Sequence, residues 1–306
     1  MRIGFAGTPE IAGRVLVALN GLNHEIALVI TKPDSVQGRG KKQSQSAVSE
    51  IASNLGLKLI KPATLIDADL KRFIQTMNLD LIVVVAYGNL IPKDLLDVPK
   101  YGWFNLHYSL LPKYRGAAPV QRAIMADESE TGVTFFKLDE GMDTGPILNQ
   151  QRCAITQQDD AISVFEELTQ MGIEIIKESI QEISEGKINL VEQDAKVSNL
   201  APKLKPGEEM INWNDSQTEI FNLIRACAAG PIAYTHFLES RVKIGRASKS
   251  DTYGLEPGRV VKTDGVIRVG TGTGDLNLLL VQPAGRKLMF ATDWYNGLHT
   301  DKVRFE

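Results

Sequence analysis

Cysteine is scarce in this sequence, with only Cys153 and Cys227 among 306 residues. The two lie far apart, form no CxxC pair and are too few for a disulfide framework. Their scarcity excludes the small proteins whose fold depends on disulfides or on a cysteine-bound zinc ion. We therefore expect a cytoplasmic protein that holds no metal.

Long apolar runs and an excess of positive charge are also missing. No run reaches the roughly 18 apolar residues of a membrane-spanning helix, so we expect no membrane span. Pro9, Glu10 and Arg14 interrupt the first apolar stretch, which argues against a signal peptide. The formal net charge is −3, so the chain as a whole lacks the basic character that indicates nucleic-acid binding.

Strands and helices alternate through the first part of the chain. Apolar runs at Arg2–Ala6, Glu25–Thr31 and Leu81–Ala86 predict strands, and apolar residues at helical spacing predict helices between them. Thr8 is expected to cap the first helix. The alternation predicts an α/β fold with a Rossmann-like, doubly wound, mostly parallel sheet, and ligand chemistry at the carboxyl ends of its strands.

The second part of the chain has a different pattern of predicted elements. Residues 207–306 contain short strands with glycine turns, which predict a small β-barrel. The GTGTG at 270–274 resembles a dinucleotide fingerprint, but no helix follows it, so we expect a hairpin turn. A polar stretch before the barrel is typical of a linker. We therefore predict domains at 1–187 and 207–306, joined by a linker at 188–206.

One predicted strand ends in the sequence NLHYSLLP, which presents two polar side chains. Asn105 and His107 are two residues apart and therefore lie on the same face of a strand. An amide can donate to a developing oxyanion, and an imidazole can donate to it or move a proton near neutral pH. The alternative is that both side chains only fix the turn that follows.

The sequence offers no evident protein nucleophile beside this pair. Ser109 lacks the GxSxG context of a nucleophilic serine, and neither cysteine has a histidine close in sequence. If the reaction is an acyl transfer, the attacking group is an amine of a substrate, and a carboxylate is needed to manage its proton. Asp143, in the loop GMDTG, is the best candidate; the alternative is that it caps its own turn.

A short basic segment stands out against the overall negative charge. Residues 32–42, KPDSVQGRGKK, carry four basic residues and one acidic residue. Glycine and polar residues predict a surface loop. Two interpretations stay open at this point: a solvated loop, or a loop that grips the phosphates of a polyanion.

The longest motifs resemble one family. NLHYSLLPKYRGAAPVQRAI at 105–124 and TGVTFFKLDEGMDTG at 131–145 resemble the formyltransferases that use 10-formyltetrahydrofolate. FAGTPE, PDSVQGRGKK, APKLKPGEEMINW and QPAGRKLM extend the resemblance over essentially the whole chain. The GRGKK loop and the QPAG segment are similar to the branch of the family that acts on aminoacyl-tRNA.

The resemblance implies roles for particular residues. It makes Asn105, His107 and Asp143 the catalytic residues, with protonated His107 and Asn105 stabilising the tetrahedral oxyanion. It places the folate beside Ala86, Tyr87, Gly88, Ser109, Leu110, Leu111, Pro112 and Asp139. It assigns the phosphates of a tRNA acceptor stem to Arg39, Lys41 and Lys42. The C-terminal barrel is expected to be OB-like and to bind the outside of the tRNA arm.

The resemblance further implies formyl transfer to methionyl initiator tRNA, and we expect the protein to be a monomer. Three alternatives remain. The acceptor is the amine of a sugar nucleotide, the acceptor is water, or the chain is a non-catalytic module that binds folate or tRNA. The basic GRGKK loop favours tRNA over a sugar nucleotide, since a small acceptor has no need of it.

Overall fold

The computed structural model describes residues 1–37, 42–298, 300 and 302–306. The chain divides into two compact units. The sheet unit comprises residues 1–116, 132–153 and 166–200, and the barrel unit comprises residues 117–131, 154–165 and 201–306. The boundaries drawn from the sequence, at 187 and 207, stay a prediction.

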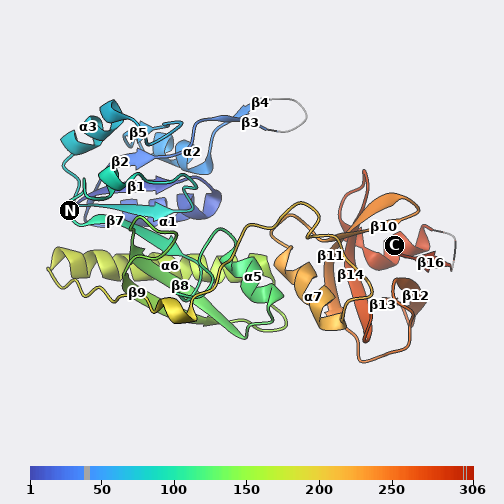
Figure 1. Cartoon of the computed structure of the whole chain (residues 1–306). Coiled ribbons are helices and arrows are strands. Elements are labelled where there is room, and N and C mark those ends of the chain that lie inside the picture. The colour runs from blue at the N-terminus through green and yellow to red at the C-terminus, as the bar shows by residue number, and fades with distance from the viewer. Residues whose placement is uncertain (38–41, 299, 301) are drawn as a thin grey trace. The chain divides into compact units, whose positions relative to one another are not determined.

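A seven-stranded sheet forms the sheet unit (Figure 1). Its strands from edge to edge are β5 (Leu59–Ile60), β2 (Glu25–Ile30), β1 (Arg2–Gly7), β6 (Leu81–Val85), β7 (Gly102–His107), β8 (Glu130–Lys137) and β9 (Ile147–Ala154). The neighbours from β5 to β7 are all parallel, and β8 is antiparallel to β7. The prediction of a doubly wound, mostly parallel sheet is confirmed.

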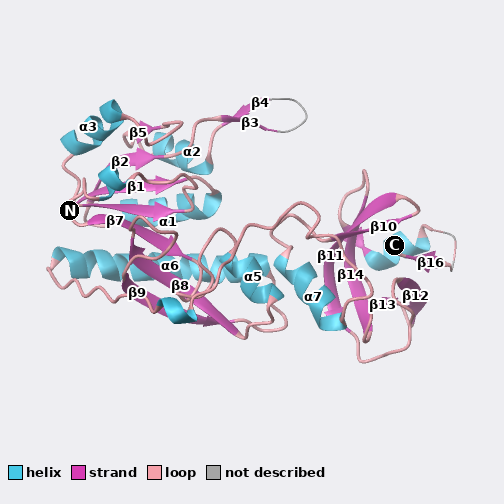
Figure 2. Ribbon diagram, viewed as in Figure 1, coloured by secondary structure: helices cyan, strands magenta, loops and turns pink. Residues whose placement is uncertain are grey.

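Helices cover both faces of this sheet (Figure 2). They are α1 (Glu10–Asn20), α2 (Ala47–Asn54), α3 (Ala68–Thr76), α4 (Lys93–Leu96) and α6 (Ala161–Ser184). On one face, Gly172 of α6 approaches β7 so closely that a Cβ there would lie 2.5 Å from Leu106. On the other, the Trp103 indole donates to the carbonyl of Leu95 in α4 at 2.7 Å. Strand alternation then puts Asn105 and His107 on the α4 face.

The expected role of Thr8 as a helix cap is wrong. Helix α1 begins at Glu10 with Pro9 as its N-cap residue and has no side-chain cap. The Thr8 hydroxyl instead donates to the carbonyl of Tyr87 at 3.1 Å. This bond joins the chain after β1 to the chain after β6, a pairing between distant segments that local sequence does not reveal.

The barrel unit contains an antiparallel, nearly closed sheet. Its strands in order are β10 (Tyr234–Phe237), β11 (Ser240–Lys249), β14 (Asp275–Pro283), β13 (Val266–Gly270), β12 (Arg259–Thr263) and β16 (Val303–Arg304), with β15 (Met289–Phe290) paired to β14. Its helices are α5 (Pro119–Met125), α7 (Gln217–Ala226) and α8 (Ala291–Asn296). The predicted OB-like barrel is confirmed.

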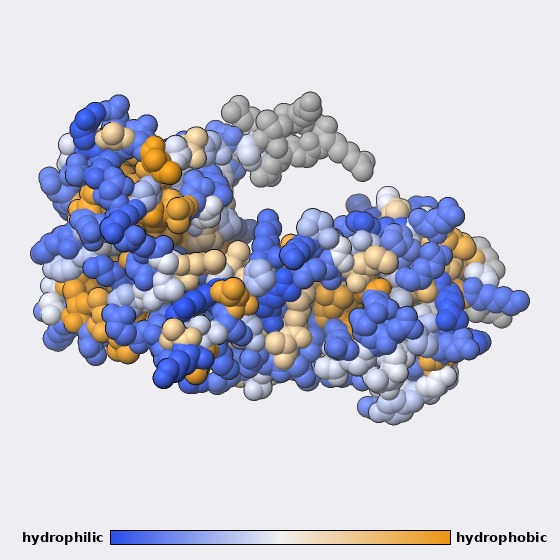
Figure 3. Space-filling view, viewed as in Figure 1, coloured by the Kyte–Doolittle hydropathy of each residue, from blue (hydrophilic) through white to orange (hydrophobic). Residues whose placement is uncertain are grey.

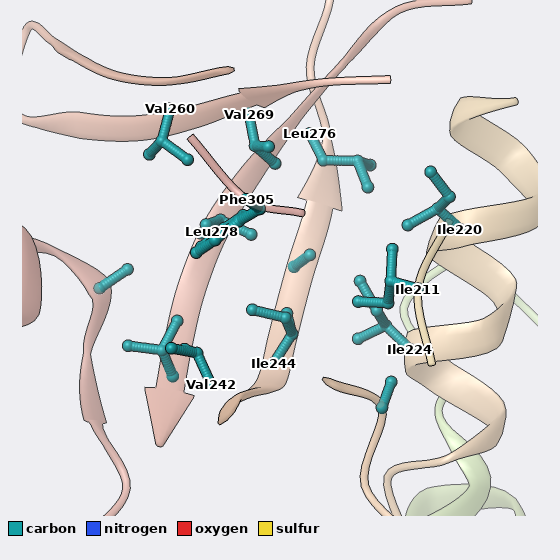
Figure 4. Close-up of a cluster of buried hydrophobic side chains, with 14 of the residues drawn as sticks. Ile211, Ile220, Ile224, Val242, Ile244, Val260, Val269, Leu276, Leu278 and Phe305 are labelled. Atoms are coloured by element: carbon teal, nitrogen blue, oxygen red, sulfur yellow. The ribbon is translucent and has the colours of Figure 1, made fainter. Parts of the chain in front are cut away.

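The core of the barrel lies between the sheet and α7. Figure 4 shows Ile220 and Ile224 of α7 facing Ile244 and Leu276 of the strands, and all four are almost completely buried. Helix α7 begins with a capping box in which Ser216 and Glu219 exchange hydrogen bonds. The expected hairpin turn at GTGTG is also confirmed, since the Thr271 N–H donates to the Gly274 carbonyl at 2.8 Å.

In the described part of the chain, no helix combines the length and apolar character needed to cross a membrane. The face drawn in Figure 3 is largely hydrophilic, and its apolar residues occur in small groups.

Candidate active site

The candidate site lies at the carboxyl ends of the parallel strands. From β1 the chain first adds β2 and β5 on one side, then returns to add β6 and β7 on the other. Such a reversal leaves a crevice outside the strand ends, where ligands bind in sheets of this kind. Ala86–Gly88 directly follow β6, and Val84 is paired with Asn105 in β7. The predicted folate and catalytic segments therefore share one edge of the sheet.

Asn105 presents an available amide at this edge. The residue is half-buried, and its side chain makes no hydrogen bond within the part of the chain that the structure describes. If Asn105 fixed the following turn, its side chain would have to form a hydrogen bond with that turn, and the described chain contains no such bond. A partly desolvated amide with unused donors suits a developing negative charge.

His107 is held between a carbonyl and a carboxylate. The residue is 5% exposed, and its Nε2 donates to the Tyr114 carbonyl at 2.9 Å. Its Nδ1 lies 3.7 Å from Oδ2 of Asp143, beyond hydrogen-bond distance but within reach of an ion pair. Because the Tyr114 carbonyl can only accept, Nε2 carries a proton and Nδ1 is the atom that titrates.

Burial lowers the pKa of His107, while the negative charge of Asp143 and the bond to Tyr114 oppose that shift. The net direction is downward, because a charged imidazole loses hydration in this site. At neutral pH the free protein therefore favours neutral His107. The protonated His107 that the resemblance implies for the oxyanion step stays a prediction.

Asp143 joins two loops that lie far apart in sequence. Its Oδ2 accepts the N–H of Gly116 at 2.8 Å, and its backbone is in the left-handed region with φ of 55°. The turn-capping role in the DEGMDTG loop belongs to Asp139, which accepts from the N–H of Gly141 at 3.0 Å and from the Thr144 hydroxyl at 2.7 Å. The carboxylate of Asp143 is thus directed at the His107 region.

The Ser109–Pro112 turn is fixed by internal hydrogen bonds. The Ser109 hydroxyl is fully buried and donates to the Lys113 carbonyl at 2.6 Å. The Thr134 hydroxyl donates to the Ser109 carbonyl at 2.6 Å and accepts from the Leu111 N–H at 3.2 Å. Leu110 and Pro112 are half-buried, whereas Leu111 is buried. Ser109 thus shapes the turn from inside, and ligand contact at this turn stays a prediction.

The turn after β6 has an unusual backbone and a cation beside it. Ala86 and Gly88 have positive φ angles of 47° and 76°, while Tyr87 is buried. A Cβ on Gly88 would lie 2.9 Å from Nζ of Lys32. From the sequence, Lys32 was assigned only to the basic segment at residues 32–42 and not to the folate site. Its position just after the carboxyl end of β2 is the signal that relates it to this edge.

A shallow recess of about 380 Å³ opens beside Asp139. It is lined by Lys93, Leu96, Asp97, Leu138, Asp139, Glu140 and Gly141. Of the residues predicted to contact folate, the recess includes Asp139. Asn105, His107 and Asp143 are not among the residues that line it.

The predicted tRNA residues lie mostly outside the described chain. Arg39 and Lys41 fall outside the described residues, and so does the side chain of Lys42. The flanking segments form an antiparallel pair, β3 (Ser35–Gln37) with β4 (Lys42–Ser44). The contact of Arg39, Lys41 and Lys42 with tRNA stays a prediction.

Comparison with known proteins identifies the class. Residues 1–180 match the family described as formyl transferase, and residues 203–299 match the formyl transferase C-terminal domain. The chain therefore belongs to the formyl transferase family, whose members are enzymes.

Two relatives of nearly equal length carry a more particular name. The chain is 41% identical over 293 residues to the methionyl-tRNA formyltransferase of Thermodesulfovibrio yellowstonii, covering 96% of this chain and 94% of the relative. It is 40% identical over 299 residues to the methionyl-tRNA formyltransferase of Carboxydothermus hydrogenoformans, covering 97% and 96%. These matches place the chain in the methionyl-tRNA formyltransferase branch of the family.

A solved structure shares the fold. HypX from Aquifex aeolicus, in complex with tetrahydrofolic acid, superposes with a TM-score of 0.69 at 19% identity. The match covers 100% of this chain and 50% of HypX, so the chain spans half the length of that protein. At this identity the likeness concerns the fold alone.

Proposed function

We propose that this chain transfers the formyl group of 10-formyltetrahydrofolate to the free α-amino group of methionyl initiator tRNA. The product is N-formylmethionyl-tRNA, which serves translation initiation. The observation that carries the proposal is the free Asn105 amide beside the His107–Asp143 pair, in a chain whose full-length relatives bear that name. The unused Asn105 amide fits a carbonyl-bearing ligand such as the formyl group of the folate.

The reaction is a direct attack by the substrate amine. Its nitrogen bonds to the formyl carbon, and the carbonyl oxygen becomes an oxyanion. The Asn105 side chain donates an N–H to this oxygen, and one such donor lowers a barrier by about 3 kcal/mol. Holding the amine and the formyl carbon together supplies a further part of the acceleration.

His107 and Asp143 manage the proton. The amine loses one proton as the new C–N bond forms, and N10 of the folate gains one as the old C–N bond breaks. Nδ1 of neutral His107 is free to accept a proton on the side that faces Asp143. The carboxylate stabilises the imidazolium that results, and the proton then passes to the folate nitrogen, directly or through water.

The proposal also includes residues that contact the folate and the tRNA. Ala86, Tyr87 and Gly88 line the folate site with Asp139 and the turn from Ser109 through Leu110 and Leu111 to Pro112. Arg39, Lys41 and Lys42 grip phosphates of the tRNA acceptor stem. Local contacts of this kind allow an acidic protein to bind tRNA, and they weaken as salt is added. We propose a cytoplasmic monomer that uses no metal.

A transfer assay tests this function. Purified protein would be incubated with 10-formyltetrahydrofolate in water, with methionyl initiator tRNA and an amino-sugar nucleotide as competing acceptors. The formylated products would be identified by mass. We expect formylmethionyl-tRNA as the main product. Formyl transfer to the sugar nucleotide, or folate turnover without a tRNA product, would contradict the proposed acceptor.

A further inference from the structure

The stretch read from the sequence as a linker contains a segment that is bonded to the catalytic loops. Val191 exchanges two hydrogen bonds of 2.8 Å with Ile147, at the start of β9. At the other end, the carbonyl of Asn199 accepts the N–H of Arg115 at 3.0 Å. Residues 191–200, hereafter the 191–200 segment, belong to the sheet unit.

Gln193 links the loop of Asp143 to the loop that follows His107. Its amide Nε2 donates to the carbonyls of Asp143 and Gly145, at 2.9 and 2.7 Å. Its Oε1 accepts from Nε and Nη2 of Arg115, at 3.1 and 2.7 Å. Arg115 is 8% exposed, so its guanidinium needs such an acceptor. Gln193 thus donates to two carbonyls of one loop and accepts from the Arg115 side chain of the other.

Asn199 supports the other partner of His107. Its Oδ1 accepts the backbone N–H of Tyr114, and the carbonyl of Tyr114 accepts from Nε2 of His107. The next N–H but one, that of Gly116, donates to the carboxylate of Asp143. Tyr114–Gly116 therefore carries one partner of each catalytic group, and the 191–200 segment fixes this stretch of backbone at two points.

We propose that Gln193 and Asn199 are positioning residues that set the geometry of the His107–Asp143 pair. The inference rests on the proposed function and deepens it, because it explains how two loops hold a carboxylate beside an imidazole. Neither side chain contacts the pair's reacting atoms. Gln193 acts through the backbone of Asp143, and Asn199 acts through Tyr114.

The need for such support follows from the backbone of Asp143. Its φ of 55° lies in the left-handed region, which aspartate adopts more readily than most residues but still at a cost in free energy. At 3.7 Å the contact with His107 has no direct hydrogen bond to maintain it. Shifting such a group by about 1 Å can lower a rate by roughly 100-fold.

Two variants of Gln193 separate positioning from simple burial of Arg115. Gln193→Leu removes all four hydrogen bonds at similar volume. Gln193→Glu keeps an acceptor for Arg115 but removes the donor and turns a carboxylate toward the Asp143 and Gly145 carbonyls. Glu192→Gln, on the exposed neighbouring residue, is the matched control. Thermal unfolding of each variant checks that it folds.

We expect both Gln193 variants to lower kcat by roughly 10- to 100-fold, with little change in the KM values for folate and tRNA. Glu192→Gln should behave as the wild type. Wild-type kcat in either Gln193 variant would overturn the inference; in Gln193→Glu it would show that Gln193 only satisfies Arg115. Asn199→Leu should lower kcat in the same direction.

A measurement without catalysis completes the test. NMR titration of the imidazole, assigned with His107→Asn, gives the pKa of His107 in the wild type and in Gln193→Leu. We expect a lower pKa in the variant, because the carboxylate of Asp143 no longer stays beside the ring. A pKa equal to the wild-type value or above it would contradict the inference. Absence of formyl transfer by the wild type would instead refute the proposed function, while this titration still decides on positioning.

Discussion

Asn105 and His107 lie on one strand but have different surroundings. Asn105 is half-buried with an unused amide, whereas His107 is buried and bonded at Nε2. The first arrangement leaves an amide donor available to a ligand, and the second fixes which ring nitrogen can exchange a proton. We therefore expect substitutions of the two residues to have separable effects on catalysis and stability.

Asn105→Ala should lower kcat by roughly 100- to 1,000-fold, which corresponds to about 3 kcal/mol of lost oxyanion stabilisation. The free energy of unfolding should change by less than about 0.5 kcal/mol, because the lost side chain has no protein partner in the described chain. Transfer kinetics and urea unfolding provide the two values. Asn23→Ala, an exposed residue before β2, is the control. A kcat near that of the wild type would remove Asn105 from the mechanism.

His107 should make the stability depend on pH. Its pKa is lowered in the folded protein by burial, so between that pKa and the unfolded value of about 6.5 the unfolded chain binds more protons. The free energy of unfolding should therefore fall as pH drops below about 6.5, and level off below the folded pKa. Urea unfolding from roughly pH 5 to 8 measures this slope.

His107→Asn provides the comparison for that slope. The free energy of unfolding of the variant should depend less on pH between about 5 and 8. Its absolute value can also change, because the substitution alters packing. Burial also lowers the pKa of His24, so part of the slope should remain. An unchanged slope would mean that His107 titrates alike in the folded and unfolded chain.

At the scale of elements, the turn after β6 can be tested with a pair of glycines. Gly88 and Gly56 both have positive φ, of 76° and 66°. A Cβ at Gly88 would meet Nζ of Lys32, whereas a Cβ at Gly56 would have no atom within 4 Å. Alanine at either position should lower the free energy of unfolding by about 1 kcal/mol through backbone strain. Only Gly88→Ala should also weaken folate binding, because it displaces Lys32 from the proposed site.

Folate binding can be followed by calorimetry with tetrahydrofolate, and unfolding by urea. Equal folate affinity in Gly88→Ala and Gly56→Ala would place the folate away from this turn. Lys32→Met would then report whether the ammonium itself contributes to binding.

The elements that the sequence predicted are those with a strong local pattern. Strands β1, β2 and β6 are continuous apolar runs. Strand β16 was missed because it is very short. Val303 and Phe305 are buried, yet their signal is two apolar residues alternating with Arg304 and Glu306, and the partner strand β12 is distant in sequence.

In the candidate site, too, the residues with a strong local pattern could be predicted and those brought together by distant contacts could not. Strand alternation places Asn105 and His107 on one face, so that pair could be found from the residues alone. The approach of Asp143 to His107 depends on the packing of two loops, and local sequence left it undecided between catalysis and turn capping. Gln193 lay in a polar stretch that looked like a linker, because its bonds to Asp143, Gly145 and Arg115 join residues far apart in the chain.

At the scale of the whole molecule, the net charge of −3 means that the proposed tRNA binding has to rely on local groups of cations. Replacing Arg39, Lys41 and Lys42 together with alanine should weaken tRNA binding and raise the KM for tRNA. If each cation neutralises one phosphate, the slope of log K against log salt should fall by about 2 to 3. Folate affinity should stay at the wild-type value, because these residues have no part in the proposed folate site.

A second triple variant separates local contact from net charge. Lys71, Arg72 and Lys177 are cations on α3 and α6, each already paired with a carboxylate. Their replacement with alanine changes the formal charge by the same amount. Filter binding at several salt concentrations measures both slopes. If the two variants lose tRNA affinity equally, long-range charge governs binding. A loss confined to the first variant assigns the phosphate contacts to Arg39, Lys41 and Lys42.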